Sequence, residues 1–238
     1  MTFSTATAPA AAALPLVSAI VPTYNRAACL GRALASVLSQ DYRPLELVVI
    51  DDGSGDATPA VIAEFRALAA NARHGAVDFI DLRQDNRGVS AARNAGIRAA
   101  HGEWIALLDS DDEWRPEKLS RQMADLAAHP GLRIGQTGEI WIRRGVRVNP
   151  PERLRKTAGD LFAASLDRCA ISPSAAVMRR GLLDEVGLFD ESYPACEDYE
   201  LWLRIACRHA VGLLDEPLLV KHGGHEDQLS AMVVALDR

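Results

Sequence analysis

The stretch LELVVIDDGSGDATPAVIAEFRALAA, residues 45–70, decides the fold that we predict for this chain. Its first six residues are mostly apolar and have the length of a buried β-strand. A polar, glycine-containing loop follows, and Thr58 and Pro59 then stand in the order of a helix N-cap and a first helical residue. Apolar residues recur beyond them at helical spacing, so the stretch predicts a strand, a loop and an amphipathic helix.

The same strand–helix unit occurs on both sides of this stretch. Residues 16–21 predict a strand that ends at Pro22, and residues 30–38 carry the apolar spacing of a helix. The elements predicted after residue 70 are, in order, a strand at 77–82, a helix at 90–100, a strand at 103–108 and a helix opened by Pro116. This alternation predicts an α/β fold with a doubly wound, mostly parallel sheet flanked by helices.

The second half of the chain is less regular. The pattern weakens from about residue 135, and the basic, proline-containing stretch 143–156 predicts a long loop or flap. That stretch could contact an anionic acceptor or a membrane surface, although a solvated loop is the simpler interpretation. Residues 170–178 indicate a strand interrupted by Pro173, and residues 197–210 are helical.

Composition narrows the class of protein. The chain has 238 residues, 48% of them hydrophobic, which suits one globular domain after a lead-in at 1–15 that we expect to be disordered. A net charge of -6 argues against a general nucleic-acid binder, and the four widely spaced cysteines are expected to be reduced. No apolar run approaches the ~20 residues of a transmembrane helix, and the lead-in lacks the features of a secretory signal, so we expect a cytoplasmic protein.

An acidic cluster follows the predicted fourth strand, in LLDSDDEW at 107–114. A helix start would account for Asp112 and Glu117, but it leaves Asp109 and Asp111 unexplained. Mg²⁺ is typically held by one or two carboxylates together with substrate phosphates. Because loops after parallel strands emerge at one edge, the residues after the first, second and fourth strands should meet this cluster at a ligand-binding edge.

Five ordered segments resemble the signatures of family 2 glycosyltransferases, the inverting class with the GT-A fold. They are VSAIVPTYNR (17–26), VVIDDGSGDAT (48–58), NRGVSAARNAGI (86–97), WIALLDSDDEW (104–114) and CEDYELWLR (196–204). The resemblance implies one GT-A domain over 16–238, with a nucleotide-sugar-binding half at 16–115 and an acceptor-binding half at 116–238.

The resemblance also implies roles at the donor side. Pro22, Thr23, Tyr24 and Asp52 would surround the nucleotide base, and Tyr24 offers a stacking surface. The nucleotide sugar would further contact Arg87, Arg93, Asp109 and Ser110, with the planar guanidinium groups suited to pyrophosphate. Mn²⁺ or Mg²⁺ would bind Asp111 directly, with Asp109 nearby and His225 as a further ligand. His222 is the alternative to His225.

At the acceptor side the resemblance implies that Asp198 is the general base, with Glu197 and Trp202 in contact with the acceptor. The expected reaction moves a sugar from a nucleoside-diphosphate sugar, UDP being the most frequent in the family and GDP and dTDP remaining open. A carbohydrate, lipid-linked or small-molecule acceptor would receive it. Two alternatives stay open: a nucleotidyltransferase, although PTYNR lacks the expected glycine-rich loop, and a nucleotide-sugar-binding protein without turnover.

Overall fold

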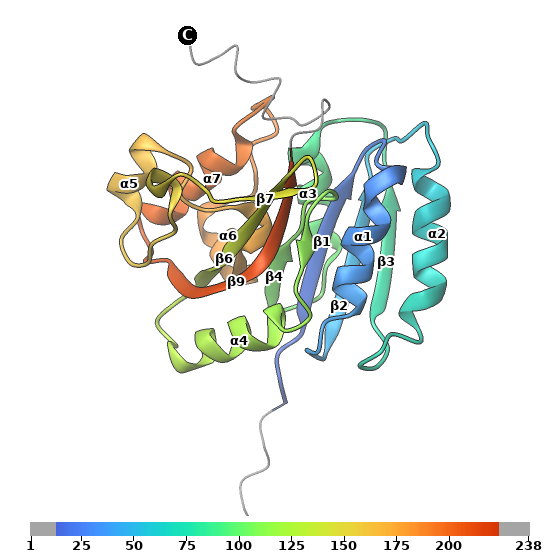
Figure 1. Cartoon of the computed structure of the whole chain (residues 1–238), viewed down its shortest axis with the longest axis horizontal. Helices are drawn as coiled ribbons and strands as arrows, with labels where there is room; N and C mark the ends of the chain where they lie inside the picture. Colours follow the sequence, from blue (N-terminus) through green and yellow to red (C-terminus); the bar gives the residue numbers. More distant parts are fainter. Residues whose placement is uncertain (1–12, 224–238) are drawn as a thin grey trace, which may run out of the picture.

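The computed structural model describes residues 13–223 and contains one large mixed sheet covered by helices (Figure 1). Its strands are β1 (Val17–Thr23), β2 (Leu45–Asp51), β3 (Asp78–Arg83), β4 (Trp104–Leu107), β5 (Glu113–Trp114), β6 (Ile134–Arg143), β7 (Val146–Val148), β8 (Val177–Arg179) and β9 (Gly212–Gly223). Its α-helices are α1 (Ala27–Leu38), α2 (Thr58–Ala69), α3 (Val89–Ala99), α4 (Lys118–Ala128), α5 (Phe162–Asp167), α6 (Arg180–Val186) and α7 (Glu197–Ala206). Two short 3₁₀ turns are η1 (Glu152–Leu154) and η2 (Pro173–Ala175).

The sheet has a parallel part and a mixed part. Its strand order is β3-β2-β1-β4-β8-β6-β9-β5, with β7 beside β6. The strands β3, β2, β1 and β4 are parallel, which confirms the predicted doubly wound core. Beyond β4 the pairs are antiparallel, except that β6 and β9 are parallel. The predicted strand–helix order therefore holds for the first half of the chain, with boundaries that differ by up to three residues.

Strand β1 does not end at Pro22 as predicted, but continues to Thr23 beside β2. The reason lies on its other side. The carbonyl of Ile20 accepts the N–H of Leu108 at 3.0 Å, so Pro22, two residues further on, faces the same direction. Pairing between β1 and β4 stops at Ile20 and Leu107, so the missing N–H of Pro22 leaves no ladder hydrogen bond unmade.

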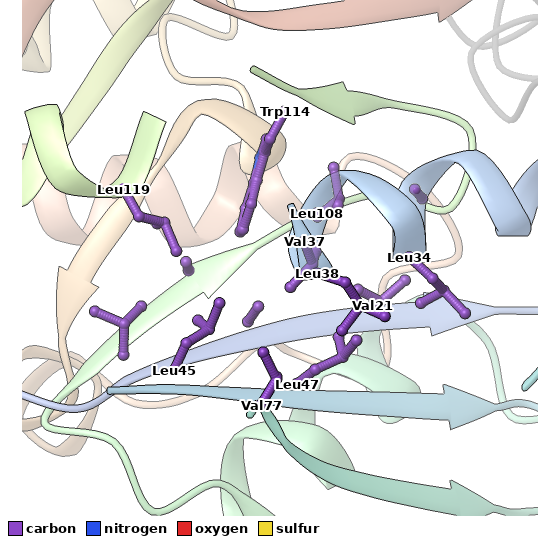
Figure 2. Packing of buried hydrophobic residues seen from close by; sticks show 14 of the residues in the cluster. Val21, Leu34, Val37, Leu38, Leu45, Leu47, Val77, Leu108, Trp114 and Leu119 are labelled. Carbon is purple, nitrogen blue, oxygen red and sulfur yellow. The ribbon is translucent and has the colours of Figure 1, made fainter. Parts of the chain in front are cut away.

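The two faces of the sheet carry separate apolar clusters. One includes Leu34, Leu47 and Trp114 and lies under α1, α2 and α4, as Figure 2 shows for part of it. The other includes Ile97 and Trp202 and lies under α3, α6 and α7. Burial on both faces explains why β1 and β2 read as continuous apolar runs rather than alternating ones.

A buried lysine lies at the border of the first cluster. Lys118 of α4 is fully enclosed, donates to Gln122 Oε1 at 2.9 Å and places its ammonium 4.4 Å from the centre of the Trp114 ring. Burial lowers the pKa of Lys118 to about 7.

Thr58, predicted as the N-cap of α2, is instead its first residue. Its hydroxyl accepts the N–H of Arg26, which ties α2 to the loop after β1.

The predicted loop or flap at 143–156 is in part a tight hairpin. Strand β6 runs into β7 through Arg144 and Gly145, both of which have positive φ as a primed two-residue turn requires. The long strand β6 escaped prediction because Gln136 and Thr137, two polar residues, are completely buried in it. Within residues 13–223, none of the four cysteines is paired in a disulfide.

Candidate active site

The loops that follow β1 and β2 are joined at the carboxyl edge of the sheet. Asn25 donates its backbone N–H to Ser54 Oγ at 2.8 Å, and its Oδ1 accepts the N–H of Gly55 at 2.8 Å. Gly53 has φ +84°, and a Cβ on it would lie only 2.9 Å from the backbone nitrogen of Asn86. The predicted convergence of the loops after β1 and β2 is confirmed, and Gly53 also lets the loop after β3 approach closely.

The residues predicted to surround the nucleotide base differ in exposure. Tyr24 is 46% exposed and leaves its ring accessible at the sheet edge. Pro22 and Thr23 are buried beneath it, and Thr23 Oγ1 has no hydrogen-bond partner. An unpaired buried hydroxyl beside an exposed aromatic ring is a suitable arrangement for a planar heterocycle with polar edges.

The carboxylate of Asp52 organises the loop before α3. Its Oδ1 accepts from Gln84 Nε2 at 2.7 Å and from the N–H of Arg87 at 3.0 Å, and its Oδ2 accepts the N–H of Gly88 at 2.9 Å. The guanidinium of Arg87 points elsewhere and pairs with Glu191 at 2.8 Å, with 64% of its side chain exposed. Asp52 therefore fixes the backbone of Arg87, while the Arg87 side chain stays at the surface.

Arg93 is the centre of the site. It is buried in α3, and its two terminal nitrogens bind Asp109 Oδ1 at 2.8 Å and Glu197 Oε1 at 2.5 Å. Its guanidinium also lies 5.2 Å from the centre of the Phe189 ring. Burial opposes its charge, but the carboxylates of Asp109, Glu197 and Asp198 outweigh burial and raise the pKa of Arg93.

The ion pair between Arg93 and Glu197 differs from the contacts predicted for these two residues. Arg93 was expected to bind pyrophosphate and Glu197 the acceptor, but in the structure they bind each other, and Glu197 is buried. Trp202 was also expected at the acceptor, but its side chain is completely enclosed in the core. The α7 sequence places Trp202 on the face that packs inward with Leu201 and Ile205, so the acceptor contact predicted for it is wrong.

Asp198 lies at the first turn of α7, with part of its side chain in contact with solvent. Its Oδ1 accepts the N–H of Tyr199 at 2.8 Å, and the thiol of Cys169 lies 3.8 Å from its Oδ2. Burial and the neighbouring charge of Glu197 raise the pKa of Asp198, against the opposing effect of Arg93. The positive end of the α7 dipole would weaken this base, whereas burial makes it a stronger one.

The acidic cluster after β4 contains groups in different environments. Asp109 and Asp111 are half-buried, while Ser110 and Asp112 are buried. Burial raises the pKa of Asp112 to about 8, although Lys221 acts in the opposite direction. Asp112 Oδ1 also accepts the N–H of His222 at 3.2 Å.

Lys221 of β9 brings a positive charge to these carboxylates. Burial opposes its ionisation, but Asp112, Glu139, Asp109 and Asp198 together raise the pKa of Lys221. The sequence did not predict that Lys221 lies beside these carboxylates. The one signal available in the sequence was that lysine is rare here, since the chain has only three lysines among 26 lysine and arginine residues.

The donor set at this edge fits a divalent cation completed by a ligand. Within residues 13–223, no three histidine, cysteine or carboxylate side chains lie close enough together to hold a metal ion. Asp111 and Asp109 nevertheless supply the one or two carboxylates that Mg²⁺ typically uses beside substrate phosphates. The predicted ligand His225 lies outside the described residues. The alternative, His222, bonds with Glu113 at 3.4 Å and is close enough for Asp111 to affect its pKa, which burial lowers.

Comparison with known families and sequences places this arrangement among sugar-transferring enzymes. Residues 18–187 match the family model of Glycosyl transferase family 2. The succinoglycan biosynthesis protein ExoO of Rhizobium meliloti is 44% identical over 126 residues, covering 53% of this chain and 34% of ExoO. The UDP-Glc:alpha-D-GlcNAc-diphosphoundecaprenol beta-1,3-glucosyltransferase WfaP of Escherichia coli is 30% identical over 198 residues, covering 81% of this chain and 70% of WfaP.

Solved structures share the fold. S. aureus TarS, residues 1–349 in complex with UDP-GlcNAc, superposes with a TM-score of 0.74 at 24% identity, covering 90% of this chain and 60% of that one. The mannosyltransferase PcManGT of Pyrobaculum calidifontis, in complex with GDP-Man and Mn²⁺, gives a TM-score of 0.66 at 23% identity, covering 88% and 57%. These likenesses confirm the predicted GT-A fold.

The chain matches only part of the length of its curated relatives. It spans 34% of ExoO and 65% of the length of an uncharacterized glycosyltransferase, RT0329, of Rickettsia typhi, to which it is 27% identical. In the part of the chain that the structure describes, none of the helices combines the length and the apolar content needed to cross a membrane.

Proposed function

Because the chain belongs to glycosyl transferase family 2, we propose that it transfers a sugar from a nucleoside-diphosphate sugar to an acceptor hydroxyl with inversion at the anomeric carbon. One observation carries the proposal. Arg93 joins Asp109, in the acidic cluster at the donor edge, to Glu197, the neighbour of Asp198. Donor-side and acceptor-side carboxylates are thereby held in one rigid network, as a direct displacement between two bound substrates requires.

We assign the donor to the edge formed by the loops after β1, β2 and β4. Tyr24 and Thr23 would lie against the base, and Asp52 would meet it from the loop that it organises. Asp111 and Asp109 would hold Mn²⁺ or Mg²⁺. Such a cation, when bound, would offset charge on the departing diphosphate. UDP is the nucleotide we expect, since WfaP is named for UDP-Glc and the TarS complex contains UDP-GlcNAc.

Asp198 is the proposed general base. Its carboxylate would accept the proton of the acceptor hydroxyl while the hydroxyl oxygen attacks the anomeric carbon. The bond between that carbon and the diphosphate oxygen breaks, and the nucleoside diphosphate leaves from the opposite face. A raised pKa suits this role, because it brings the proton affinity of the carboxylate closer to the operating pH.

The first experiment is calorimetry of UDP, GDP and dTDP with and without Mn²⁺, on the native protein and on Asp111→Ala. We expect one nucleotide to bind in a Mn²⁺-dependent way, and the substitution to remove that dependence. If none of the three binds under either condition, the assignment of the donor site is wrong.

A second variant separates an enzyme from a nucleotide-sugar-binding protein without turnover. Asp198→Asn should keep nucleotide affinity and lose transfer by about 10²-fold or more, since an amide cannot accept the proton. The anomeric configuration of the product, read by NMR, checks inversion. Unchanged transfer in Asp198→Asn would remove Asp198 from the mechanism.

A further inference from the structure

A second group of charged residues lies on the acceptor side, outside the site described so far. Glu139 of β6 has only 6% of its side chain exposed. Its Oε1 accepts from Trp141 Nε1 at 2.7 Å, its Oε2 accepts from Ser172 Oγ at 2.9 Å, and Lys156 Nζ lies 3.5 Å away. Lys156 has 9% of its side chain exposed and donates to Ser172 Oγ at 2.8 Å. A buried ion pair of this kind is costly to build for stability alone.

This group borders a cavity of about 270 Å³ between the paired strands β6 and β9, which run side by side in Figure 1, and the segment 150–156. Its walls include Gly138, Glu139, Pro150, Leu154, Lys156 and Pro217. Small-molecule sites combine apolar walls with a few placed polar groups, and this cavity is at the lower end of their usual size, about 300 Å³. It therefore suits a single ring-sized ligand.

The charges of the cavity favour a neutral ligand. The basic stretch 143–156 suggested an anionic acceptor, but the lining carries both signs of charge. Among the side chains that the structure describes there, the charged ones are Glu139, Glu152, Asp215, Arg155 and Lys156. Hydroxyl groups suit such a mixed lining, because they can both donate to carboxylates and accept from an ammonium.

Several contacts link the cavity to Asp198. Ser172, which binds both Glu139 and Lys156, lies three residues after Cys169, whose thiol is 3.8 Å from Asp198 Oδ2. Burial, and then the charge of Asp198, raise the pKa of Cys169 to about 12, while Lys156 opposes them. The segment 169–172 therefore connects the cavity with the proposed base.

We infer that this cavity is a subsite for a neutral sugar unit of the acceptor, held by Glu139 and Lys156 beside Asp198. The assignment rests on the proposed function for its role in transfer, but saccharide binding can be tested independently. In this assignment Trp141, and not Trp202, is the aromatic residue of the acceptor side. Trp141, whose indole N–H fixes Glu139, is the partly exposed tryptophan, whereas Trp104, Trp114 and Trp202 are buried.

The test is saturation-transfer NMR with neutral methyl glycosides of glucose, galactose and N-acetylglucosamine, and with methyl glucuronide, each with and without UDP and Mn²⁺. We expect at least one neutral glycoside to bind the native protein and the glucuronide to bind about tenfold more weakly. Leu154→Trp would fill the cavity without removing a charge. It should weaken that binding by about tenfold or more and leave nucleotide affinity unchanged.

Val146→Trp is the matched control, because Val146 is 64% exposed on the neighbouring hairpin and does not line the cavity. It should bind glycosides as the native protein does. If Leu154→Trp does not fold, Glu139→Gln keeps the shape of the cavity and should weaken binding in the same way.

Absence of glycoside binding to the native protein, or equal binding by Leu154→Trp, would overturn the subsite. Preferred binding of glucuronide would overturn its neutral character. Failure of UDP to bind, with glycoside binding intact, would count against the proposed function alone.

Discussion

At the scale of single residues, Arg93 carries more of the site than any other side chain. It neutralises two carboxylates that would otherwise face each other in a partly enclosed space. The sequence singled out Arg93 from its motif, but not its role. Its partner Glu197 lies 104 positions away in the chain, and no local pattern could reveal that pairing.

Replacing Arg93 should therefore affect both stability and activity. Arg93→Met leaves Asp109 and Glu197 without their shared partner, and we expect unfolding free energy to fall by about 3 kcal/mol, the lower end for a broken buried pair because Asp109 is 30% exposed. Urea unfolding measures the loss. Arg98→Met on the same helix, where the side chain is 61% exposed, should change stability by less than about 0.5 kcal/mol. Equal losses in the two variants would contradict this account.

The raised pKa of Asp198 predicts the pH dependence of transfer. As pH falls through that pKa, protonation removes the base, so kcat/KM should decline at a pH above the ordinary aspartate value of about 3.9. The pH profile of kcat/KM, measured with the donor identified by calorimetry, checks this. An acid limb at about 3.9 would show that burial does not govern this carboxylate.

At the scale of elements, α3 lies close against the sheet at Gly96. A Cβ on Gly96 would lie 2.5 Å from Ile50 Cδ1 and 2.7 Å from Ile20 Cγ2. Gly96 therefore sets the distance between α3 and strands β1 and β2, and with it the position of Arg93 three residues earlier. The SAARNAGI pattern predicted a helix here, but only the packed structure explains the glycine.

Gly96→Ala tests this spacing against a second helical glycine. Overpacking should cost about 1–3 kcal/mol in unfolding free energy, measured by urea titration, and should lower transfer by displacing α3. In Gly31→Ala of α1 the new Cβ would lie 3.4 Å from Phe65 and 4.0 Å from Val61, which is ordinary contact, so the variant should be neutral or stabilise by up to about 1 kcal/mol from helix propensity. A stabilised Gly96→Ala variant would contradict the tight packing.

The elements also show where prediction from sequence reached its limit. The parallel half of the sheet could be predicted from apolar runs, helical spacing and loop residues, because each of these signals is local in the sequence. The continuation of β1 through Pro22 depended on where β4 stops, and β6 was obscured by buried Gln136 and Thr137. The donor-edge residues came from motifs at strand ends, whereas Glu139, Lys156 and Lys221 lie inside or after the irregular half and had no such marker.

At the scale of the whole molecule, Lys118 links stability to pH. Its folded pKa of about 7 lies below the ordinary lysine value of about 10.4, so between these values the unfolded chain holds a proton that the folded protein has released. Stability should therefore rise with pH across that window, by up to about 1.4 kcal/mol per pH unit, and Lys118→Met should lack this rise. Urea unfolding of both proteins from pH 7 to 9 measures the difference. Parallel pH profiles would show that Lys118 stays protonated.

The scarcity of lysine has a practical consequence. The three lysines occupy three separate places: Lys118 in the core, Lys156 at the acceptor cavity and Lys221 among the donor-edge carboxylates. A protein grown with lysine carrying ¹³C at the ε-carbon would give one resonance from each place. Nucleotide should move the Lys221 signal most and saccharide the Lys156 signal most, whereas unfolding by denaturant should move all three, so a single spectrum could tell ligand binding from loss of the fold.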